Sequence, residues 1–365
     1  MYISAQSNAQ TNFPWESPLK IAWSTDGTVF SNESIFQDSS GVPSAIRWRG
    51  DTLVCAFQWF RAPLGSLTWD KVAVKFSYDN GATWTVPEPI VVNGLPPGYQ
   101  RPFDPTLARL NGDSVRIYFS SSLGMPPMGL DSTVNTYSAL STDGINYSFE
   151  PGARFDHPTN KAIDPAVLFF NGMWHYSCPA GPPQAGAYHA TSFNGLQFLQ
   201  QPDFPSDPLH NWTGNMLYES NSVMKFYGCG QNIWHNSTTD GFTWAGYINT
   251  NLLGGDPTAV KISPNNYLII FVGPPNPTGT SELTPWLLPG IYPQPVTDYF
   301  TIQNPGSDTF DYTIYDISGR IISTGAGKKE SKISAGGLKN GMYFIELKNK
   351  TGRIHLLRFI KQSPN

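Results

Sequence analysis

The sequence predicts an all-β protein, in which a five-bladed β-propeller precedes a smaller unit of alternating strands. Two sets of internal repeats and the composition lead to this prediction. Among 365 residues, 34 are Gly and 32 are Pro, 14% are aromatic and only 14% are charged. This composition is typical of many short strands joined by turns, rather than of helices or a disordered chain.

The first repeat is a polar turn. Its complete copy is Ser77–Trp84, and looser copies begin at Ser24, Ser141, Ser192 and Ser237. Each copy combines a serine, a turn aspartate or asparagine, a glycine and an anchoring aromatic residue. Such a combination closes a hairpin, because an Asx turn holds the backbone and glycine accepts a positive φ. The copies are about 46 to 63 residues apart, which is the spacing of propeller blades.

The second repeat is a short apolar strand, a tight polar turn and an aromatic strand. Its five copies begin at Val42, Asp104, Asp164, Asn215 and Asp256. A further strand runs from each copy into a Ser-Asp-Gly turn, so each unit has four strands, as a propeller blade does. The fifth unit lacks its own turn, while the turn at Ser24 precedes the first unit. We therefore expect the strand over residues 19–30 to complete the last blade and close the ring.

Four segments follow from these patterns. Residues 1–18 form an N-terminal segment whose start, MYISAQSNAQ, suits either the remnant of a signal peptide or an ordinary disordered terminus. Residues 19–273 form the propeller, and residues 274–290 a linker rich in Pro, Gly and Thr. Residues 291–365 form a separate unit, marked by a shift in charge: nine of the 23 Lys and Arg residues follow Gly327.

The C-terminal unit carries specific motifs. They are Tyr292–Asp298, Tyr315–Arg320, Leu338–Tyr343 and Arg358–Lys361, in this order. The unit resembles the type A C-terminal sorting domain of the type IX secretion system of Bacteroidetes, with Gln294 where Asn is commoner. The resemblance implies an immunoglobulin-like β-sandwich that directs export across the outer membrane and is then removed or exchanged for a surface anchor. The protein is thus expected to be extracellular or attached to the outer-membrane surface.

Charge and cysteine content exclude several other functions. A net charge of −4 gives no basic field, so we expect no nucleic-acid partner. No apolar run is long enough for a transmembrane segment. Cys55, Cys178 and Cys229 show no CxxC spacing, and we expect them to be small buried side chains without a disulfide. We expect no metal, no cofactor and a monomer, although an ion on a propeller axis would leave no motif.

The chemistry is expected where the first strand of each blade begins, at one mouth of the propeller axis. Three of the five positions there are aspartates, and carboxylates that converge raise one another's pKa, as a general acid requires. The candidate catalytic residues are Asp104, Asp164 and Asp256; the candidate substrate-binding residues are Arg101, Lys161 and Asn215. The alternative is that each Asp-Pro pair caps a turn, with the carboxylate accepting backbone N–H groups.

The propeller resembles two groups of proteins. Ser77–Trp84 matches the Asp box of sialidases and of many non-enzymatic propellers, although sialidases have six blades and an arginine triad. Ile163–Phe169, together with Asp104-Pro105, resembles the five-bladed glycoside hydrolases of family 43 and its relatives. That resemblance implies that Asp104 is the catalytic base and that Asp164 tunes the pKa. It also implies a glutamate as the acid, but Asn215 stands at that position.

Two other glutamates do not replace it. Glu219 is expected in the middle of a strand and Glu150 at the surface. Two functions therefore stay open. One is a secreted glycoside hydrolase that acts on extracellular polysaccharide. The other is a non-catalytic propeller that binds glycan or protein at the cell surface.

Overall fold

The computed structural model describes residues 17–60, 69–123, 134–274, 290–292, 295–303, 309–317, 319–328, 330–349 and 354–362. In these ranges the chain consists of β-strands joined by turns, with a single 3-10 turn, η2 (Pro183–Ala185). The all-β prediction is confirmed. The predicted N-terminal segment and linker lie almost entirely outside the described residues. The chain divides into two compact units, Met1–Asn276 and Pro277–Asn365. Where the chain is described, it holds no helix that could span a membrane.

The first unit contains five sheets in the described ranges. The first sheet is β3 (Ser40–Arg49), β4 (Thr52–Trp59), β5 (Lys71–Ser77) and β6 (Glu88–Pro89). The second is β8 (Phe103–Arg109), β9 (Val115–Ser122), β10 (Val134–Ser141) and β11 (Asn146–Phe155), with β7 (Val91–Asn93) parallel to β11. The third is β12 (Ala166–Phe170), β13 (Met173–Pro179), β14 (Ala187–Ser192) and β15 (Leu199–Phe204). The fourth is β16 (His210–Ser220), β17 (Val223–Gly230), β18 (Trp234–Thr238) and β19 (Ile248–Asn249).

The fifth sheet joins the two ends of this unit. It is formed by β20 (Gly255–Ser263), β21 (Asn266–Val272), β1 (Leu19–Ser24) and β2 (Phe30–Gln37). Strand β1 runs antiparallel to β21, with Leu19 opposite Val272 and Ser24 opposite Tyr267. The prediction that the N-terminal strand completes the last sheet is confirmed by this register.

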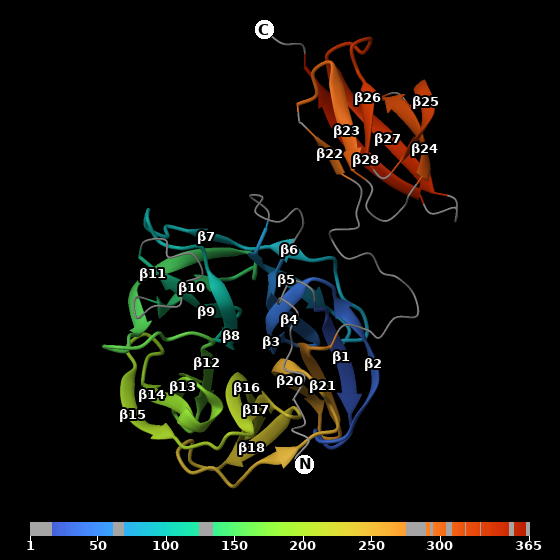
Figure 1. Ribbon diagram of the computed structural model, residues 1–365. Helices are drawn as coiled ribbons and strands as arrows, with labels where there is room; N and C mark the ends of the chain where they lie inside the picture. The colour runs from blue at the N-terminus through green and yellow to red at the C-terminus, as the bar shows by residue number, and fades with distance from the viewer. Residues whose placement is uncertain are drawn as a thin grey trace, which may run out of the picture. The chain divides into compact units, whose positions relative to one another are not determined.

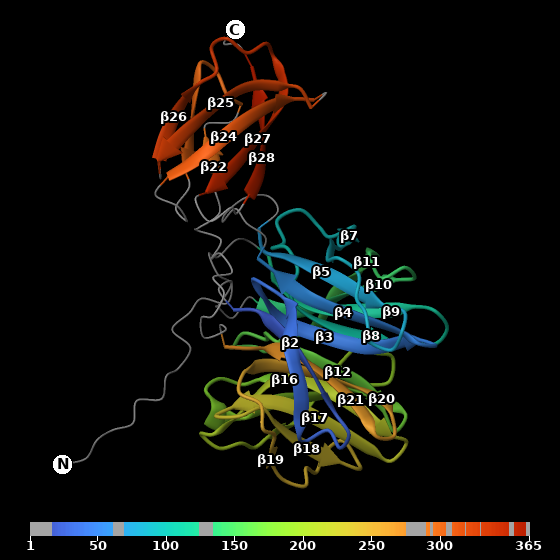
Figure 2. The same ribbon diagram turned by 90° about the vertical axis from the view of Figure 1, so that its right-hand side faces the viewer.

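The five sheets follow one another around a common centre (Figure 1). The first strand of each sheet lies innermost, and these strands contact one another in the cycle β3, β8, β12, β16, β20 and back to β3. A separate hydrophobic cluster fills the space between each pair of neighbouring sheets, including the fifth and the first. Turned by 90°, the first sheet shows β3, β4 and β5 side by side (Figure 2).

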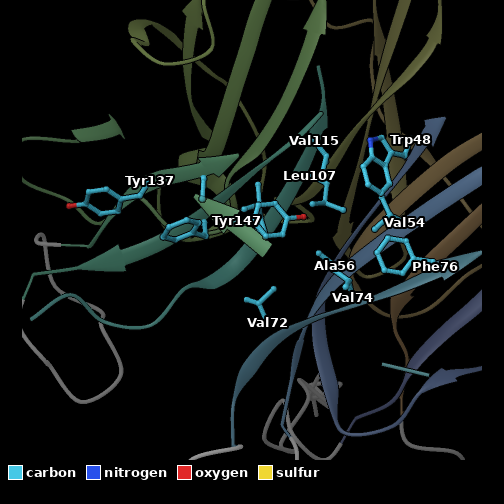
Figure 3. Close-up of a cluster of buried hydrophobic side chains, with 13 residues drawn as sticks. Trp48, Val54, Ala56, Val72, Val74, Phe76, Leu107, Val115, Tyr137 and Tyr147 are labelled. Atoms are coloured by element: carbon cyan, nitrogen blue, oxygen red, sulfur yellow. The ribbon is translucent and has the colours of Figure 1, made fainter. Parts of the chain in front are cut away.

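The hydrophobic cluster between the first and second sheets shows how neighbouring sheets pack against each other (Figure 3). Trp48 and Phe76 of the first sheet face Leu107 and Tyr147 of the second, and all four side chains are buried. Each such side chain stabilises the fold by about 1.5–3 kcal/mol when it leaves water. The alternation of apolar residues along the short strands thus places one core on each face of every sheet.

The repeated polar turns have the predicted chemistry. In each of the five, a hydroxyl accepts the N–H of the glycine and donates to the turn aspartate or asparagine. The five hydroxyl residues are Ser24, Ser77, Ser141, Ser192 and Thr238. The prediction that Ser237 opens the fifth turn is wrong. The neighbouring Thr238 has the hydroxyl that Asp240 and Gly241 require.

Gly241 provides a test of these turns. Its φ is +84°, and a Cβ there would lie 2.1 Å from the ring of His175, which is buried in the third sheet. We expect Gly241→Ala to lower the free energy of unfolding by about 2–4 kcal/mol, because the left-handed backbone cost and the overpacking add. Gly172→Ala is the control, since Gly172 has a φ of +82° but open space around it. Denaturant unfolding should show the smaller loss for the control; equal losses would contradict the clash.

The second unit has two sheets in its described part. One is β22 (Gly290–Tyr292), β23 (Tyr299–Gln303) and β26 (Glu330–Ser334); the other is β25 (Ile321–Lys328), β24 (Thr309–Asp316), β27 (Gly341–Asn349) and β28 (Ile354–Lys361). Both sheets contribute to one hydrophobic cluster, for example Phe300 and Ile314. Asp316 accepts the backbone N–H of Arg320 at the turn between β24 and β25.

Candidate functional site

The innermost strands begin with the same irregularity. In the first, second and fifth sheets the pairing shifts register between Gly41 and Ser44, between Phe103 and Thr106, and between Gly255 and Thr258. A bulge of this kind redirects a side chain, and bulges gather near active sites. The residues with positive φ at these positions are Val42 (48°), Asp104 (49°), Asp164 (52°) and Asp256 (44°). Left-handed backbone is uncommon for residues other than glycine, although aspartate accepts it more readily than valine.

Two of the three aspartates hold the neighbouring sheet. Asp104 Oδ2 accepts the backbone N–H of Asp164 at 3.4 Å, and the carboxyl of Asp256 accepts the N–H of Val42. Each bond joins one sheet to the equivalent position of the next. As the structural alternative predicts, both carboxylates accept backbone N–H groups, but these groups belong to the following sheet and not to the aspartate's own turn.

The three carboxyl groups also share a perturbed electrostatic environment. Burial, with a smaller contribution from the charge of Asp256, raises the pKa of Asp104 to about 7. Burial raises the pKa of Asp256 to about 6. Burial, then the charges of Asp104 and Asp256, raise the pKa of Asp164 well above its usual range. Carboxyl groups with pKa values such as those of Asp104 and Asp256 exchange protons near neutral pH, as acid–base catalysis requires.

Asp164 differs from the other two aspartates in its contacts. Its carboxyl accepts no hydrogen bond from any described residue, and it lines a pocket of about 430 Å³. The opposite end of that pocket is formed by residues of β16 and of the turn after β13, including Asn211 and Gly181. Asp104, in contrast, is buried behind it with 9% of its surface exposed. The structure thus presents Asp164 to a ligand and holds Asp104 behind it.

Asn215 lies deeper on the axis than the sequence repeat suggested. Its Oδ1 accepts from the Thr106 hydroxyl at 2.8 Å, and its Nδ2 donates to the Pro43 carbonyl at 3.0 Å. These bonds tie the fourth sheet to the first and second. They occupy the side chain, so the expected substrate contact does not follow from its position. Strand β16 contains one extra residue before Asn215, and the position equivalent to the aspartates is Thr213.

Arg101 also differs from its expected place. Its guanidinium pairs with the Asp70 carboxylate and does not balance Asp104. Asp70 Oδ1 in turn accepts from Gln58 Nε2 at 2.5 Å, and Gln58 Oε1 accepts the backbone N–H of Asp104 at 3.4 Å. The negative charge of Asp70 contributes to the raised pKa of Asp104. Sequence reasoning missed Asp70 and Gln58, because neither lies near Asp104 in the chain.

Lys161, the third predicted substrate-binding residue, lies beside Asp164. It lines the same pocket as Asp164, and its positive charge opposes the rise in the pKa of Asp164. Below the pocket, the axis narrows to a neck of about 10 Å³ between Asp164, Asp256 and Asn215. That neck holds roughly one water molecule at most. A sugar-sized ligand therefore does not fit into this neck.

The two glutamates near the expected positions are both held in ion pairs. Glu219 pairs with Lys225 and Lys261, and Tyr267 donates to its Oε1 at 2.7 Å. Glu150 was expected at the surface, and this is wrong: its carboxylate binds the buried guanidinium of Arg116 through both oxygens. Neither glutamate lines the pocket beside Asp164.

Among the described residues, no cluster of side chains indicates a metal site and no cysteine indicates a reactive thiol. No group of three or more His, Cys, Asp or Glu side chains there could hold a metal ion. The three cysteines are free, and burial raises the pKa of Cys178 and of Cys229 to about 12. Cys55 and Cys178 are buried as expected, whereas Cys229 is only half-buried.

The raised pKa of Asp104 predicts a gain in stability when its charge is removed. A carboxyl group whose pKa rises from 3.8 to about 7 on folding stabilises the fold fully below pH 3.8 and loses that contribution as pH rises through 7. We therefore expect Asp104→Asn to be more stable than the wild type at pH 8, by on the order of 2 kcal/mol. The difference should shrink towards pH 4.

Thermal unfolding across pH 4–8 measures this effect. The control is Asp79→Asn, because hydrogen bonds from Thr83 and Ser77 lower the pKa of the exposed Asp79 to about 2. Its carboxylate stabilises the turn above pH 3.8, so the control should be less stable than the wild type at pH 8. A stability difference for Asp104→Asn that does not depend on pH would contradict the prediction.

Comparisons with known proteins agree with this two-part organisation. Residues 290–362 match the family model of the secretion system C-terminal sorting domain. The chain therefore carries this domain at its C-terminal end. No curated protein sequence matches the chain.

Several solved structures with a similar backbone are glycoside hydrolases. A native arabinanase of Bacillus subtilis has 15% identity and a TM-score of 0.43, covering 64% of this chain and 93% of its own. A family 43 enzyme of Xanthomonas citri has 13% identity and a TM-score of 0.45, covering 89% and 91%. A sialidase of Trypanosoma rangeli has 11% identity and a TM-score of 0.40, covering 94% and 88%.

Proposed function

We propose that residues 19–273 form a five-bladed β-propeller that binds a carbohydrate beside Asp164 and hydrolyses its glycosidic bond. The cycle of five sheets and the five hydrophobic clusters between them support the blade count. Residues 291–365 form the immunoglobulin-like sandwich that the type IX secretion machinery recognises. The protein then acts outside the cell or at its surface, as a monomer.

One observation carries the catalytic proposal. Asp164 combines a raised pKa, a carboxyl group without a hydrogen-bond partner among the described residues, and a position on a pocket of about 430 Å³. A carboxylic acid that keeps its proton near neutral pH and faces a ligand is suited to general acid catalysis. Asp164 donates its proton to the oxygen of the leaving sugar as the bond from that oxygen to the anomeric carbon breaks.

The second carboxyl group is Asp256. Its pKa of about 6 is raised less than that of Asp104, and it flanks the same neck as Asp164. In its ionised form it takes a proton from the water whose oxygen adds to the anomeric carbon. Asp104 is a positioning residue, which holds the backbone of Asp164 and affects the pKa of its carboxyl. This assignment moves the base from Asp104, where the family resemblance placed it, to Asp256.

A binding function is the second candidate. Glycoside hydrolysis with two carboxyl groups needs one of them, a glutamate or an aspartate, as the acid. Both nearby glutamates are held in ion pairs, so hydrolysis depends on Asp164 as the acid. If Asp164 does not serve as the acid, the same pocket binds a glycan or a protein without turnover.

Product release distinguishes the two functions. The full chain is incubated with plant and algal polysaccharides and with sialosides, beside Asp164→Asn and Asp256→Asn. Sugar release by the wild type that both substitutions abolish is the expected result. Retention on an immobilised glycan without release would replace hydrolysis by binding, and neither release nor retention would favour a protein ligand.

A further inference from the structure

The pocket beside Asp164 has an uneven distribution of charge. Its walls come from the segment before β12, from the turn after β13 and from the start of β16. Most of its lining groups are neutral, and several are polar, including Thr159, Asn160 and Thr213. The charged side chains among its lining residues are Lys161 and Asp164.

The ammonium group of Lys161 is uncommitted. Among the described residues it forms neither an ion pair nor a hydrogen bond, in contrast to Arg101, which is bound to Asp70. Lys161 is half-buried and lines the pocket, and its ammonium group has three N–H donors. An ammonium group in such a place binds an anion more strongly than it would on an open surface.

Asp164 does not neutralise the positive charge of Lys161. The raised pKa of its carboxyl keeps it protonated over a range in which an ordinary aspartate is ionised. A negatively charged ligand is therefore attracted by Lys161 without an equal repulsion from Asp164.

We propose that the ligand of this pocket is an acidic sugar, whose carboxylate or sulfate group pairs with Lys161. The inference rests on the proposed function in taking the ligand to be a carbohydrate. It goes further in naming the class: a uronate-containing or sulfated polysaccharide rather than a neutral one. A volume of about 430 Å³ is within the range of pockets that hold small ligands.

Matched pairs of polysaccharides test the class. Polygalacturonate is compared with its methyl ester, and a sulfated galactan with its desulfated product, by titration calorimetry on the full chain. We expect the charged member of at least one pair to bind about tenfold more tightly or better, with an affinity that falls as salt increases. Preference for the first pair identifies a carboxylate, and preference for the second identifies a sulfate.

Substitution of Lys161 tests the mechanism. Lys161→Gln should remove the preference for the charged member of a pair, whereas Lys161→Arg should keep part of that preference. Lys339→Gln is the control, because it removes the same charge from an exposed position in the second unit. Equal affinity for both members of each pair, or a preference that survives Lys161→Gln, would overturn the inference.

Sugar release measured in parallel separates this inference from the proposed function. Release from neutral polysaccharides without any charge preference would overturn the acidic ligand and leave hydrolysis intact. Charge-dependent binding through Lys161 without sugar release would support the acidic ligand and overturn hydrolysis. Failure to bind any member of either pair would overturn the acidic ligand, and the wider panel would then decide on hydrolysis.

Discussion

Asp164→Asn is expected to lower the rate of sugar release by about 10³-fold or more. Loss of a general acid removes the proton that the leaving oxygen needs, and such groups contribute about 10²–10⁴-fold. Asparagine keeps the size of the side chain, so the pocket and its affinity for the sugar should change little. The measurement is kcat and KM on the polysaccharide that the panel identifies, with Asp51→Asn as a control at an exposed aspartate.

The pH dependence of the wild type adds a second readout. Activity should rise as pH increases through about 6, where Asp256 loses its proton, and fall where Asp164 loses its own. Asp104→Asn should move the falling limb to lower pH, since a neutral neighbour no longer raises the pKa of Asp164. Unchanged activity of Asp164→Asn, or a falling limb that stays in place in Asp104→Asn, would remove these residues from the mechanism.

Glu150→Ala is expected to lower the free energy of unfolding by about 3–5 kcal/mol. Glu150 binds Arg116 through distances of 2.8 and 2.9 Å, and the Ser138 hydroxyl donates to it at 2.6 Å. Arg116 is only 6% exposed. Without Glu150 its charge stays buried and uncompensated, which is the costly outcome for a buried pair. Denaturant unfolding of the full chain measures the loss.

Two further variants isolate the cause of that loss. Ser138→Ala removes one hydrogen bond from the cluster and should cost about 1 kcal/mol. Arg116→Met combined with Glu150→Leu removes both charges, and should cost less than Glu150→Ala alone. If the double variant instead loses as much unfolding free energy as Glu150→Ala or more, packing rather than charge is responsible.

The sequence predicted the parts of this protein that depend on neighbouring residues. The polar turns need only a hydroxyl, an aspartate or asparagine and a glycine within a few positions, so they were visible as a repeat. The Asp-Pro pairs could also be recognised as a repeat, because each pair consists of two neighbouring residues. Even here, the extra residue in β16 displaced Asn215 from the predicted position, because a repeat does not reveal a local insertion.

Contacts between sheets could not be predicted in this way. Arg101 was predicted to bind substrate, but its guanidinium pairs with Asp70, which lies just before β5 of a different sheet and far from Arg101 in the sequence. Glu150 was expected at the surface because it follows a hairpin. In the structure Glu150 pairs with Ser138 of β10, and its carboxylate binds Arg116 of β9. The burial that raises the pKa of Asp164 likewise exists only after the sheets have assembled.

The pairing of β1 with β21 sets an order of events during folding. Strand β1 leaves the ribosome early, yet its partner follows about 250 residues later, and closing so long a loop is slow. The other four sheets form from consecutive segments. The fifth must wait, with the edges of β1 and β21 open to any other strand. This last step is where separate copies of the chain would associate wrongly, and where a chaperone would have the greatest effect.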